Sequence, residues 1–428
     1  MIVICSIACV AHLQAQDLLT LDEAKAITLA NNFGIQIARN NVEIAENNTD
    51  KRVNNYWPSV SANGGMNGSL GGSSQKFNNG SEASTSNAFT WGANASVRAD
   101  LTIVDKRRSL SLQQLKENLT LTDLQLRQTI EQNLFEVFNR FYLIAQLAGN
   151  VEAREEAISI SNDRLRRAQV QLELGQGDGL QILNAEVDIK RDSVNLLNAN
   201  MELENEKRNL NIAMGREVSI AFNVEAGTLE DEPLNLPNLV SESMESNIAL
   251  QANRQNLKLN EMELHIIDAE KQPTLTGGAQ YNLNFTDSPS GAFIDQSSSR
   301  GIQANVGINW TLFDPSRKIR KDNVVIGLAN QQLQIEELEQ QIERDIVNAW
   351  ANYQNAQFVL EVEESAVATN RENFVRTEQK FQAGQLSSID FRQAQLNLLN
   401  AQTSLNTARF NAKLMEIQLL QLGGRIIE

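Results

Sequence analysis

Cysteine and histidine are nearly absent from the sequence. Its two cysteines, Cys5 and Cys9, lie within the segment from Met1 to Ala15, and one of its two histidines lies there as well. If that segment is removed on export, no thiol is left to oxidise or to bind a metal, and His265 is the one remaining imidazole. The carboxylates are scattered along the chain without a metal-ligand cluster or a nucleophile and base pattern. We therefore expect no catalytic residue, no metal and no cofactor, and the protein is not expected to be an enzyme.

Positive charge is also scarce. The chain has 37 lysine and arginine residues against 53 aspartate and glutamate residues, which gives a formal net charge of −16 at pH 7. Binding to a phosphate backbone requires clustered lysine and arginine, and the sequence has no extended basic run. Nucleic acid is therefore excluded as a partner.

Long apolar runs are missing beyond the N-terminus. Residues 1–15 have the character of a signal peptide that ends at Ala15, so the mature chain is expected to start at Gln16 or Asp17. The positively charged start of such a signal is missing, which leaves open a misplaced start codon or a clipped segment. No later stretch approaches the ~18 consecutive apolar residues of a membrane-spanning helix. If the protein crosses a membrane, it does so with strands.

The sequence contains one unit written twice. Segments that begin at Asp105 and at Asp314 run in parallel, at a spacing of about 209 residues, to Arg216 and Arg425. We place the first repeat at residues 17–216, a linker at 217–237 and the second repeat at 238–425.

Each repeat is expected to consist of a helix of roughly 35 residues, two strands, a helix of about 70 residues and a helix of about 35. We expect the later elements at 58–70, 88–104, 106–175 and 180–215 in the first repeat, and at 273–286, 301–313, 316–384 and 388–422 in the second. A helix of about 70 residues is about 100 Å long and needs a cover of equal length. Two stacked helices of half that length supply it, which predicts long antiparallel coiled coils.

The long helices carry one apolar stripe each, with steps of three, four and seven residues. The stripe residues are Leu115, Leu119, Leu126, Ile130, Leu134, Val137 and Phe141 in the first repeat, and Ile335, Leu338, Ile342, Ile346, Ala349 and Tyr353 in the second. An exported coiled-coil rod would explain these stripes equally well, so the helices alone do not decide the function.

The strands alternate between apolar and polar residues. From Phe89 to Ile103 every odd position is apolar and most even positions are polar, and the other three strands repeat this pattern. Runs of this length suit strands that face lipid on one side and a wet lumen on the other. A soluble sandwich has the same alternation, but its strands are usually shorter. The stretches at 71–87 and 287–299 are rich in serine, glycine and asparagine and are expected to be exposed loops.

Four strands cannot close a membrane barrel, because the smallest such barrels need about eight and lipid tolerates no unpaired sheet edge. The chain must therefore associate with copies of itself. Two, three or four copies all satisfy this requirement.

The doubled order of helix, strand pair, long helix, glycine turn and helix resembles the TolC family of outer-membrane efflux proteins over essentially the whole mature chain. The stretch from Phe381 through Gly384 and Asp390 to Ala394 is similar to the family's pattern at a helical hairpin tip, and the stretch around Gly175 is a weaker version of it. The resemblance implies an α+β membrane protein. It would be a homotrimer with a 12-strand β-barrel in the outer membrane and a 12-helix α-barrel in the periplasm. It also implies a periplasmic adaptor and an inner-membrane pump or secretion ATPase as partners.

The same resemblance implies a gate at the hairpin tips. Family members narrow the tunnel with acidic residues, and Asp390 matches the first of these positions whereas Gln393 occupies the second. Three copies of Asp390 would favour cations. An aspartate in the first turn of a helix also simply favours the helix dipole. Family members can hold the tip closed with a tyrosine hydroxyl bonded to an aspartate, but Phe381 and Gln181 occupy those positions here, so the latch must differ.

Gly175 and Gly384 are expected to end their helices in a left-handed conformation, which lets the chain reverse at the tips. We predict an outer-membrane channel subunit with a periplasmic extension, in a Gram-negative envelope, that exports small molecules or polypeptides in a tripartite efflux or type I secretion system. An exported structural or adhesive coiled-coil protein without a pore is the alternative. No residue pattern selects a cargo.

Overall fold

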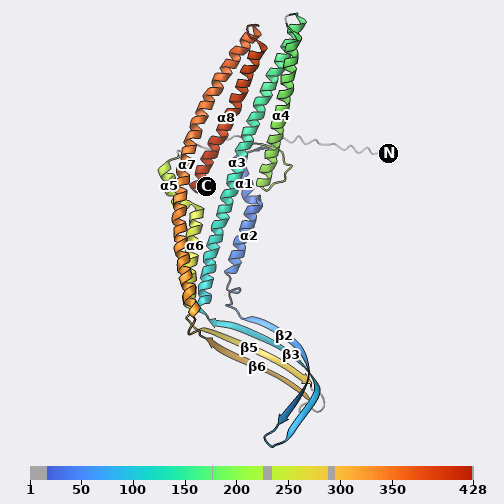
Figure 1. Ribbon diagram of the computed structural model, residues 1–428, viewed down its shortest axis with the longest axis vertical. Coiled ribbons are helices and arrows are strands. Elements are labelled where there is room, and N and C mark those ends of the chain that lie inside the picture. The colour runs from blue at the N-terminus through green and yellow to red at the C-terminus, as the bar shows by residue number, and fades with distance from the viewer. Residues whose placement is uncertain (1–16, 176, 225–233, 288–294, 427–428) are drawn as a thin grey trace, which may run out of the picture. The chain divides into compact units, whose positions relative to one another are not determined.

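The computed structural model describes residues 17–175, 177–224, 234–287 and 295–426 of the chain. The expected signal peptide at 1–15 lies outside these residues. Within them, helices and strands follow one another in the doubled order expected from the repeat (Figure 1). The first repeat contains β1 (Asp17–Leu19), α1 (Leu21–Asn31), α2 (Phe33–Asn48), β2 (Ser59–Lys76), β3 (Glu82–Val104), α3 (Lys106–Glu173) and α4 (Gly179–Ala213). After β4 (Phe222–Val224), the second contains α5 (Leu236–Ser246), α6 (Ile248–Ala269), β5 (Thr274–Asp287), β6 (Gln296–Asn309), α7 (Pro315–Gln382) and α8 (Ser388–Leu422).

The chain forms two compact units, and each takes segments from both repeats. We call residues 1–40, 124–252 and 335–428 the helical unit, and residues 41–123 and 253–334 the sheet unit. The strands β2, β3, β5 and β6 lie in the sheet unit, and the helical hairpins α3–α4 and α7–α8 turn in the helical unit. The repeat is visible in the element lengths, since α3 and α7 both have 68 residues and α4 and α8 both have 35.

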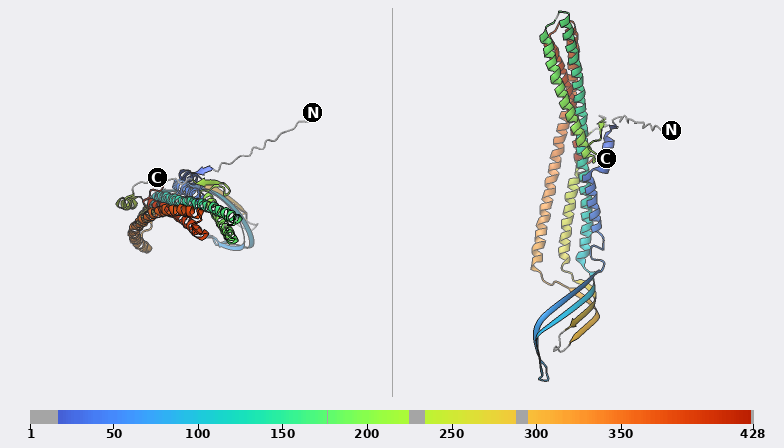
Figure 2. Two further views of the ribbon diagram at one scale, coloured as in Figure 1. Left: turned by 90° about the horizontal axis from the view of Figure 1, so that it is seen from above. Right: turned by 90° about the vertical axis from the view of Figure 1, so that its right-hand side faces the viewer.

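The sheet unit contains one antiparallel sheet in the order β2-β3-β5-β6. The four strands lie side by side in Figure 2, coloured from blue to orange along the chain. The register pairs Ser59 with Asp100, Val104 with Leu275 and Thr274 with Asn309. All four strand ends that adjoin helices therefore lie at the same end of the sheet.

The strands differ from expectation at their polar ends. β2 continues to Lys76 and β3 begins at Glu82, so the expected loop at 71–87 is mostly paired strand. Backbone pairing continues because serine, glycine and asparagine donate and accept ladder hydrogen bonds as well as apolar residues do, and Lys76 forms an ion pair of 3.0 Å with Glu82 beside the turn. In the second repeat β6 covers Gln296–Asn309 rather than 301–313. Its expected last residues lie past the strand, where the Trp310 Nε1 donates to the Lys271 carbonyl at 2.9 Å.

The helical unit has a continuous apolar core between α1, α3, α4 and α8. The stripe residues Leu134, Val137 and Phe141 of α3 are buried there against Leu210 of α4 and Ile417 of α8. In α7 the stripe residues Ile335, Ile342, Ile346 and Ala349 are buried as well. The other predicted stripe residues of both helices are partly buried. Among the described residues, no helix is both long enough and apolar enough to span a membrane.

The helix expected at the start of each repeat is divided in two, which corrects the expectation of a single helix of about 35 residues. The break is at Asn32 in the first repeat and at Asn247 in the second, and both have non-helical backbone angles. The Asn32 Oδ1 accepts a hydrogen bond from the Ile35 amide at 3.0 Å, and the Asn247 Oδ1 accepts one from the Leu250 amide at 3.1 Å. An asparagine that caps the following helix ends the preceding one without a proline or glycine.

The break in the first repeat is also tied to the end of α4. The Asn32 Nδ2 donates to the Ala213 carbonyl at 2.7 Å and to the Asn133 Oδ1 at 2.9 Å. Within the predicted linker at 217–237, Phe222–Val224 form β4, which pairs in parallel with β1, and α5 begins at Leu236. These three-residue strands fasten the start of the first repeat to the beginning of the linker.

Candidate functional site

The two hairpin tips contain every site residue that the sequence singled out. Gly175 follows α3 and Gly384 follows α7, with φ angles of 72° and 71°. The Gly175 amide donates to the Leu172 carbonyl at 3.0 Å and the Gly384 amide donates to the Phe381 carbonyl at 3.1 Å. A Cβ at either glycine would meet no atom within 4 Å, so it is the left-handed backbone rather than crowding that favours glycine here.

The helices that leave the tips begin with side-chain caps. The Asp178 Oδ1 accepts from the Gln181 amide at 3.1 Å at the start of α4. The Ser387 Oγ accepts from the Asp390 amide at 3.2 Å at the start of α8, and its hydroxyl donates to the Asp390 Oδ2 at 2.7 Å. These bonds satisfy amides that have no partner within the helix.

Asp390 is exposed in the first turn of α8 and pairs with no basic side chain among the described residues. Gln393 is also exposed, one turn further on, and donates to the Asn397 Oδ1 at 2.9 Å. The geometry of Asp390 suits a helix start as well as a charged ring, so both interpretations fit this single chain.

Phe381 and Gln181 are not brought together in the described part of the chain, since no ring contact or hydrogen bond joins them. Phe381 instead stacks on Phe391 of α8, with ring centroids 4.7 Å apart and an interplanar angle of 20°. Phe374 contacts the same ring at 5.5 Å. Together with Ile160 of α3 these rings form a small apolar cluster near the tip. The α7–α8 hairpin is thus held near its turn by aromatic packing.

A buried polar network joins the first-repeat hairpin to α8, and sequence reasoning missed it. Both Nη atoms of Arg392 donate to the carboxylate of Asp192 on α4, each at 2.7 Å. The Ser161 Oγ on α3 donates to the same carboxylate at 3.0 Å. The Arg392 and Asp192 side chains are 12% and 7% exposed. A bidentate pair with so little exposure is desolvated and depends on its geometry.

Gln395 of α8 completes this network. Its Nε2 donates to the Ala157 carbonyl at 2.6 Å and to the Ser161 Oγ at 2.9 Å, and its Oε1 accepts from Arg392 at 3.1 Å. Beside the pair, Arg164 of α3 binds Asp188 of α4. Three helices from two repeats therefore share one set of hydrogen bonds. We call Ser161, Asp188, Asp192, Arg392 and Gln395 the interhairpin network.

The interhairpin network stabilises the charged form of Arg392. Burial alone would lower the pKa of its guanidinium, but the hydrogen bonds and charge of Asp192, together with the charge of Asp188, raise the pKa above its ordinary value. Arg392 therefore remains charged throughout the physiological range, and the pair cannot be released by its deprotonation.

Further hydrogen bonds between polar side chains join α3 and α8 beyond the interhairpin network. The Gln402 Nε2 donates to the Glu156 carboxylate at 2.7 Å, and the Asn406 Nδ2 donates to the Asn150 Oδ1 at 3.0 Å. Gly149 of α3 leaves room for the Asn406 side chain, since a Cβ there would come within 2.8 Å of the Asn406 Nδ2. The hairpins of the two repeats are thus joined by polar side chains rather than by an apolar stripe alone.

One signal in the sequence pointed to the interhairpin network. Asp188 and Asp192 lie three and seven residues after the buried Ala185, on the face of α4 that packs inward. Acids at core positions of a helix need a partner. The partner itself lies 200 residues away in sequence, so its identity followed only from the packing of α4 beside α8.

Comparison with known proteins agrees with this architecture. Residues 239–425 match the family model described as outer membrane efflux protein. A comparison with curated proteins finds no match for the chain. Several solved structures are similar over nearly the whole chain.

The CmeC outer membrane channel of Campylobacter jejuni is 12% identical, with a TM-score of 0.73, and the match covers 95% of this chain and 85% of that one. The outer membrane protein VceC of Vibrio cholerae is 14% identical, with a TM-score of 0.70 and coverage of 94% and 96%. The MtrE outer membrane channel of Neisseria gonorrhoeae, in its open state, is 16% identical, with a TM-score of 0.67 and coverage of 95% and 89%. The family model and the shared fold confirm the predicted resemblance to TolC-like outer-membrane efflux proteins and the predicted α+β fold class.

Proposed function

We propose that this chain, whose second repeat matches the outer membrane efflux proteins, is the subunit of an outer-membrane export channel. The observation that carries this proposal is the four-stranded sheet, because it has two unpaired edges and an exposed apolar face. Within the residues that the structure describes, β2 and β6 each pair on one side only. The exposed apolar side chains include Val60, Met66, Leu70, Phe89, Ile302, Val306 and Ile308, which are 56% to 79% exposed.

Such a sheet is unstable in water as a single copy, since exposed apolar strands and open edges favour association. In a membrane, the same apolar face contacts lipid and the open edges must pair. The edge β6 of one copy would pair with β2 of the next until the sheet closes. Three copies, the number that the family resemblance implies, bring together twelve strands.

The helical unit offers surfaces for the same association. Leu180, Leu183, Val187, Val194, Leu197 and Met201 form a stripe along α4 and are 56% to 63% exposed. On α7, Phe358 and Val362 are 64% and 48% exposed. Apolar stripes of this kind are buried in coiled coils, so we propose that α4 of one protomer packs against α7 of its neighbour.

At the hairpin tips we propose a gate. Three copies of Asp390 would surround the axis and concentrate negative potential there, which favours cations over anions. The interhairpin network would keep the two hairpins of each protomer together while the tip is closed. The stacked Phe381 and Phe391 rings replace a hydroxyl latch with apolar packing.

By the same resemblance the channel works with a periplasmic adaptor and an inner-membrane pump or secretion ATPase, and it lies in the outer membrane of a Gram-negative envelope. Small molecules and polypeptides are both proposed as cargo, since the channel acts as a conduit. The second candidate function is a structural or adhesive rod, and it does not explain why the strands expose an apolar face.

Reconstitution of the full-length protein into a planar lipid bilayer tests this function. We expect detergent-dependent solubility, a mass of three protomers and discrete conductance steps. Ile302→Lys places a charge on the apolar face of β6, and it should prevent insertion because a lysine facing lipid costs about 2–4 kcal/mol at the bilayer centre. The matched control is Gln303→Lys, which puts the same charge on the polar face and should still insert. A water-soluble monomer without conductance would favour the rod.

A further inference from the structure

The end of the sheet that adjoins the helices collects four separate segments. They are residues 50–57, 103–108, 268–273 and 310–321, and we call them the junction. All four lie in the sheet unit, and the strand register places their strand ends side by side. Hydrogen bonds connect them directly, such as that from the Arg108 Nη1 to the Asn55 carbonyl at 2.7 Å and that from the Trp310 Nε1 to the Lys271 carbonyl at 2.9 Å.

The junction is basic although the chain is acidic. Its four segments contain ten lysine and arginine residues and five aspartate and glutamate residues, whereas the whole chain has a net charge of −16. A local excess of positive charge in an acidic protein creates a surface that attracts anions.

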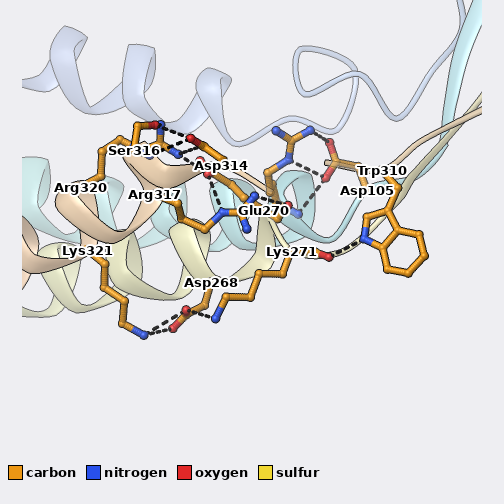
Figure 3. Close-up of polar contacts among 11 residues, drawn as sticks. Asp105, Asp268, Glu270, Lys271, Trp310, Asp314, Ser316, Arg317, Arg320 and Lys321 are labelled. Atoms are coloured by element: carbon orange, nitrogen blue, oxygen red, sulfur yellow. Dashed lines mark hydrogen bonds and ion pairs between the residues drawn. The ribbon is translucent and has the colours of Figure 1, made fainter. Parts of the chain in front are cut away.

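The acids of the junction have partners within it. Figure 3 shows this for Asp105, Asp268, Glu270 and Asp314, and Asp50 binds Arg52. Asp268 pairs with Lys321 at 2.8 Å and with Lys271 at 3.2 Å, and Glu270 binds Arg317 and Arg320. Hydrogen bonds from Lys321 are the main cause of a lowered pKa for Asp268, and a hydrogen bond from Ser316 is the main cause for Asp314. These carboxylates are therefore ionised at neutral pH and engaged with neighbours.

Three lysines of the junction have no acidic partner in the described part of the chain. Lys51 lies over the Tyr56 ring, with its Nζ 5.9 Å from the ring centroid, and the other two are Lys106 and Lys318. Lys106 is exposed in the first turn of α3, and Lys318 is exposed in the first turn of α7. The ends of these helices are already capped, since the Arg107 amide donates to the Asp105 Oδ1 and the Ser316 amide donates to the Asp314 Oδ1, both at 2.9 Å. One amide at each helix start is thus satisfied, and the exposed lysine ammonium groups are the charged donors that an anion would meet.

The segments of the junction also contain large apolar side chains that are open to solvent in the single chain. Trp310, Leu312, Phe313 and Ile319 are 57%, 77%, 84% and 63% exposed, and Trp57 in the first repeat is 65% exposed. Tryptophan and lysine together are typical of the level at which lipid headgroups meet acyl chains. The junction thus presents positive charge and apolar surface side by side.

We propose that the junction binds the headgroups of anionic phospholipids, with Lys106 and Lys318 against the phosphates and Trp310, Leu312 and Phe313 against the upper acyl chains. The inference rests on the proposed function, because it requires the strands to lie in a membrane. Net positive charge makes an anionic headgroup such as phosphatidylglycerol a better partner than a zwitterionic one.

Native mass spectrometry of the full-length protein in detergent tests this. The protein is mixed with equal amounts of phosphatidylglycerol and phosphatidylethanolamine of the same acyl chains, and the retained lipids are counted. We expect wild type to retain more phosphatidylglycerol than phosphatidylethanolamine. In the double variant Lys106→Gln/Lys318→Gln the ratio of the two retained lipids should fall roughly tenfold, because each lysine near an anionic surface contributes to the attraction. The preference should also fall as salt is raised.

The matched control is Lys190→Gln/Lys380→Gln, which removes the same charge from exposed positions on α4 and α7. It should keep the wild-type preference, and an equal loss in both double variants would overturn the proposal. So would complete displacement of phosphatidylglycerol by millimolar inorganic phosphate, since that would reveal a site for free anions. Bilayer conductance of the wild type separates the two ideas: a conducting protein without lipid preference contradicts only this inference, and a protein that never conducts contradicts the channel itself.

Discussion

The guanidinium of Arg392 on α8 donates two hydrogen bonds of 2.7 Å each to the carboxylate of Asp192 on α4. The two residues belong to different repeats, so this pair is one of the contacts that join the two hairpins. Desolvated pairs of this kind contribute specificity more than net stability, because the attraction mostly offsets the cost of removing both charges from water. We interpret it as the residue contact that sets how the two hairpins of one protomer meet near their tips.

Arg392→Leu should destabilise the helical unit by about 3–5 kcal/mol, because it leaves the Asp192 carboxylate buried without its partner. The double variant Arg392→Leu/Asp192→Leu should recover most of that loss. Thermal unfolding of the purified protein measures both, and bilayer recordings should show more frequent opening of the double variant. The control is Arg409→Leu, which breaks an exposed pair with Glu364 and should cost no more than about 1 kcal/mol. Equal losses for Arg409 and Arg392 would remove the special role of the network.

Asp390→Asn should reduce the preference for cations in a potassium chloride gradient, measured as a shift of the reversal potential toward zero. The reason is that, in the proposed trimer, the variant removes three symmetric negative charges at the tip. Asparagine keeps the shape of the side chain, so protein stability should change little. Gln393→Glu adds an acid at the neighbouring position and should shift the reversal potential in the opposite direction. If neither variant alters selectivity, Asp390 serves only the start of α8.

Much of the fold could be predicted because its signals are local. The apolar stripes, the glycine turns and the alternation of the strands each depend on residues within a few turns of one another. They placed α4 at 180–215 and α8 at 388–422, where the structure has Gly179–Ala213 and Ser388–Leu422. The breaks at Asn32 and Asn247 were missed because one residue leaves the apolar period of the flanking helices unchanged.

The parts of the site that depend on contacts between residues far apart in the sequence could not be predicted. Gly175 and Gly384 followed from turn chemistry, whereas the partner of Asp192 depended on which helix lies beside α4. The short strands β1 and β4 were missed for the same reason, because their pairing joins Leu18 to Asn223 and a three-residue run carries no periodicity. The sequence shows that position 381 holds a phenylalanine, which has no hydroxyl to form a latch. Only the structure shows that its ring stacks on Phe391 instead.

Phe381→Ala should loosen the α7–α8 tip, because it removes the ring stacked on Phe391 at 4.7 Å. The expected cost is about 1–3 kcal/mol, since Phe381 is only partly buried. Limited proteolysis should cut the variant near Gly384 faster than wild type. Phe33→Ala removes the same ring from an exposed site at the start of α2 and should not increase cleavage at the tip. Unchanged cleavage in Phe381→Ala would show that the stack does not hold the turn.

Glu131 of α3 predicts a pH dependence of stability. The residue is 8% exposed, and its Oε1 has no hydrogen-bond partner among the described residues. Burial raises its pKa from 4.5 to about 7, against a smaller opposing effect of Arg127. Because the folded pKa lies above the unfolded one, folding favours the protonated form, and stability is lost as pH rises between about 4.5 and 7.

Glu131→Gln should therefore unfold at a higher temperature than wild type at pH 8, with a gain of at most about 3 kcal/mol, and the difference should disappear near pH 4.5. Thermal unfolding at both pH values measures this. The exposed Glu152 lies on the same helix, and Glu152→Gln should show the same difference from wild type at both pH values. A Glu131→Gln gain that is independent of pH would point to packing rather than ionisation.

A comparison of Gly215 with Gly175 distinguishes two reasons why a position requires glycine: a left-handed backbone and a lack of space for a Cβ. Both follow a helix with φ of 72°, so replacing either by alanine incurs the same left-handed penalty of roughly 1–2 kcal/mol. A Cβ at Gly175 would meet no atom within 4 Å, but a Cβ at Gly215 would lie 2.3 Å from the carbonyl oxygen of Asn31. That oxygen belongs to the backbone beside the Asn32 break and cannot move without disturbing the bond between Asn32 and Ala213. Gly215→Ala should thus lower the unfolding temperature far more than Gly175→Ala, and it should expose the α1–α2 break to protease. Equal effects of the two substitutions would mean that the end of α4 is not held against this break.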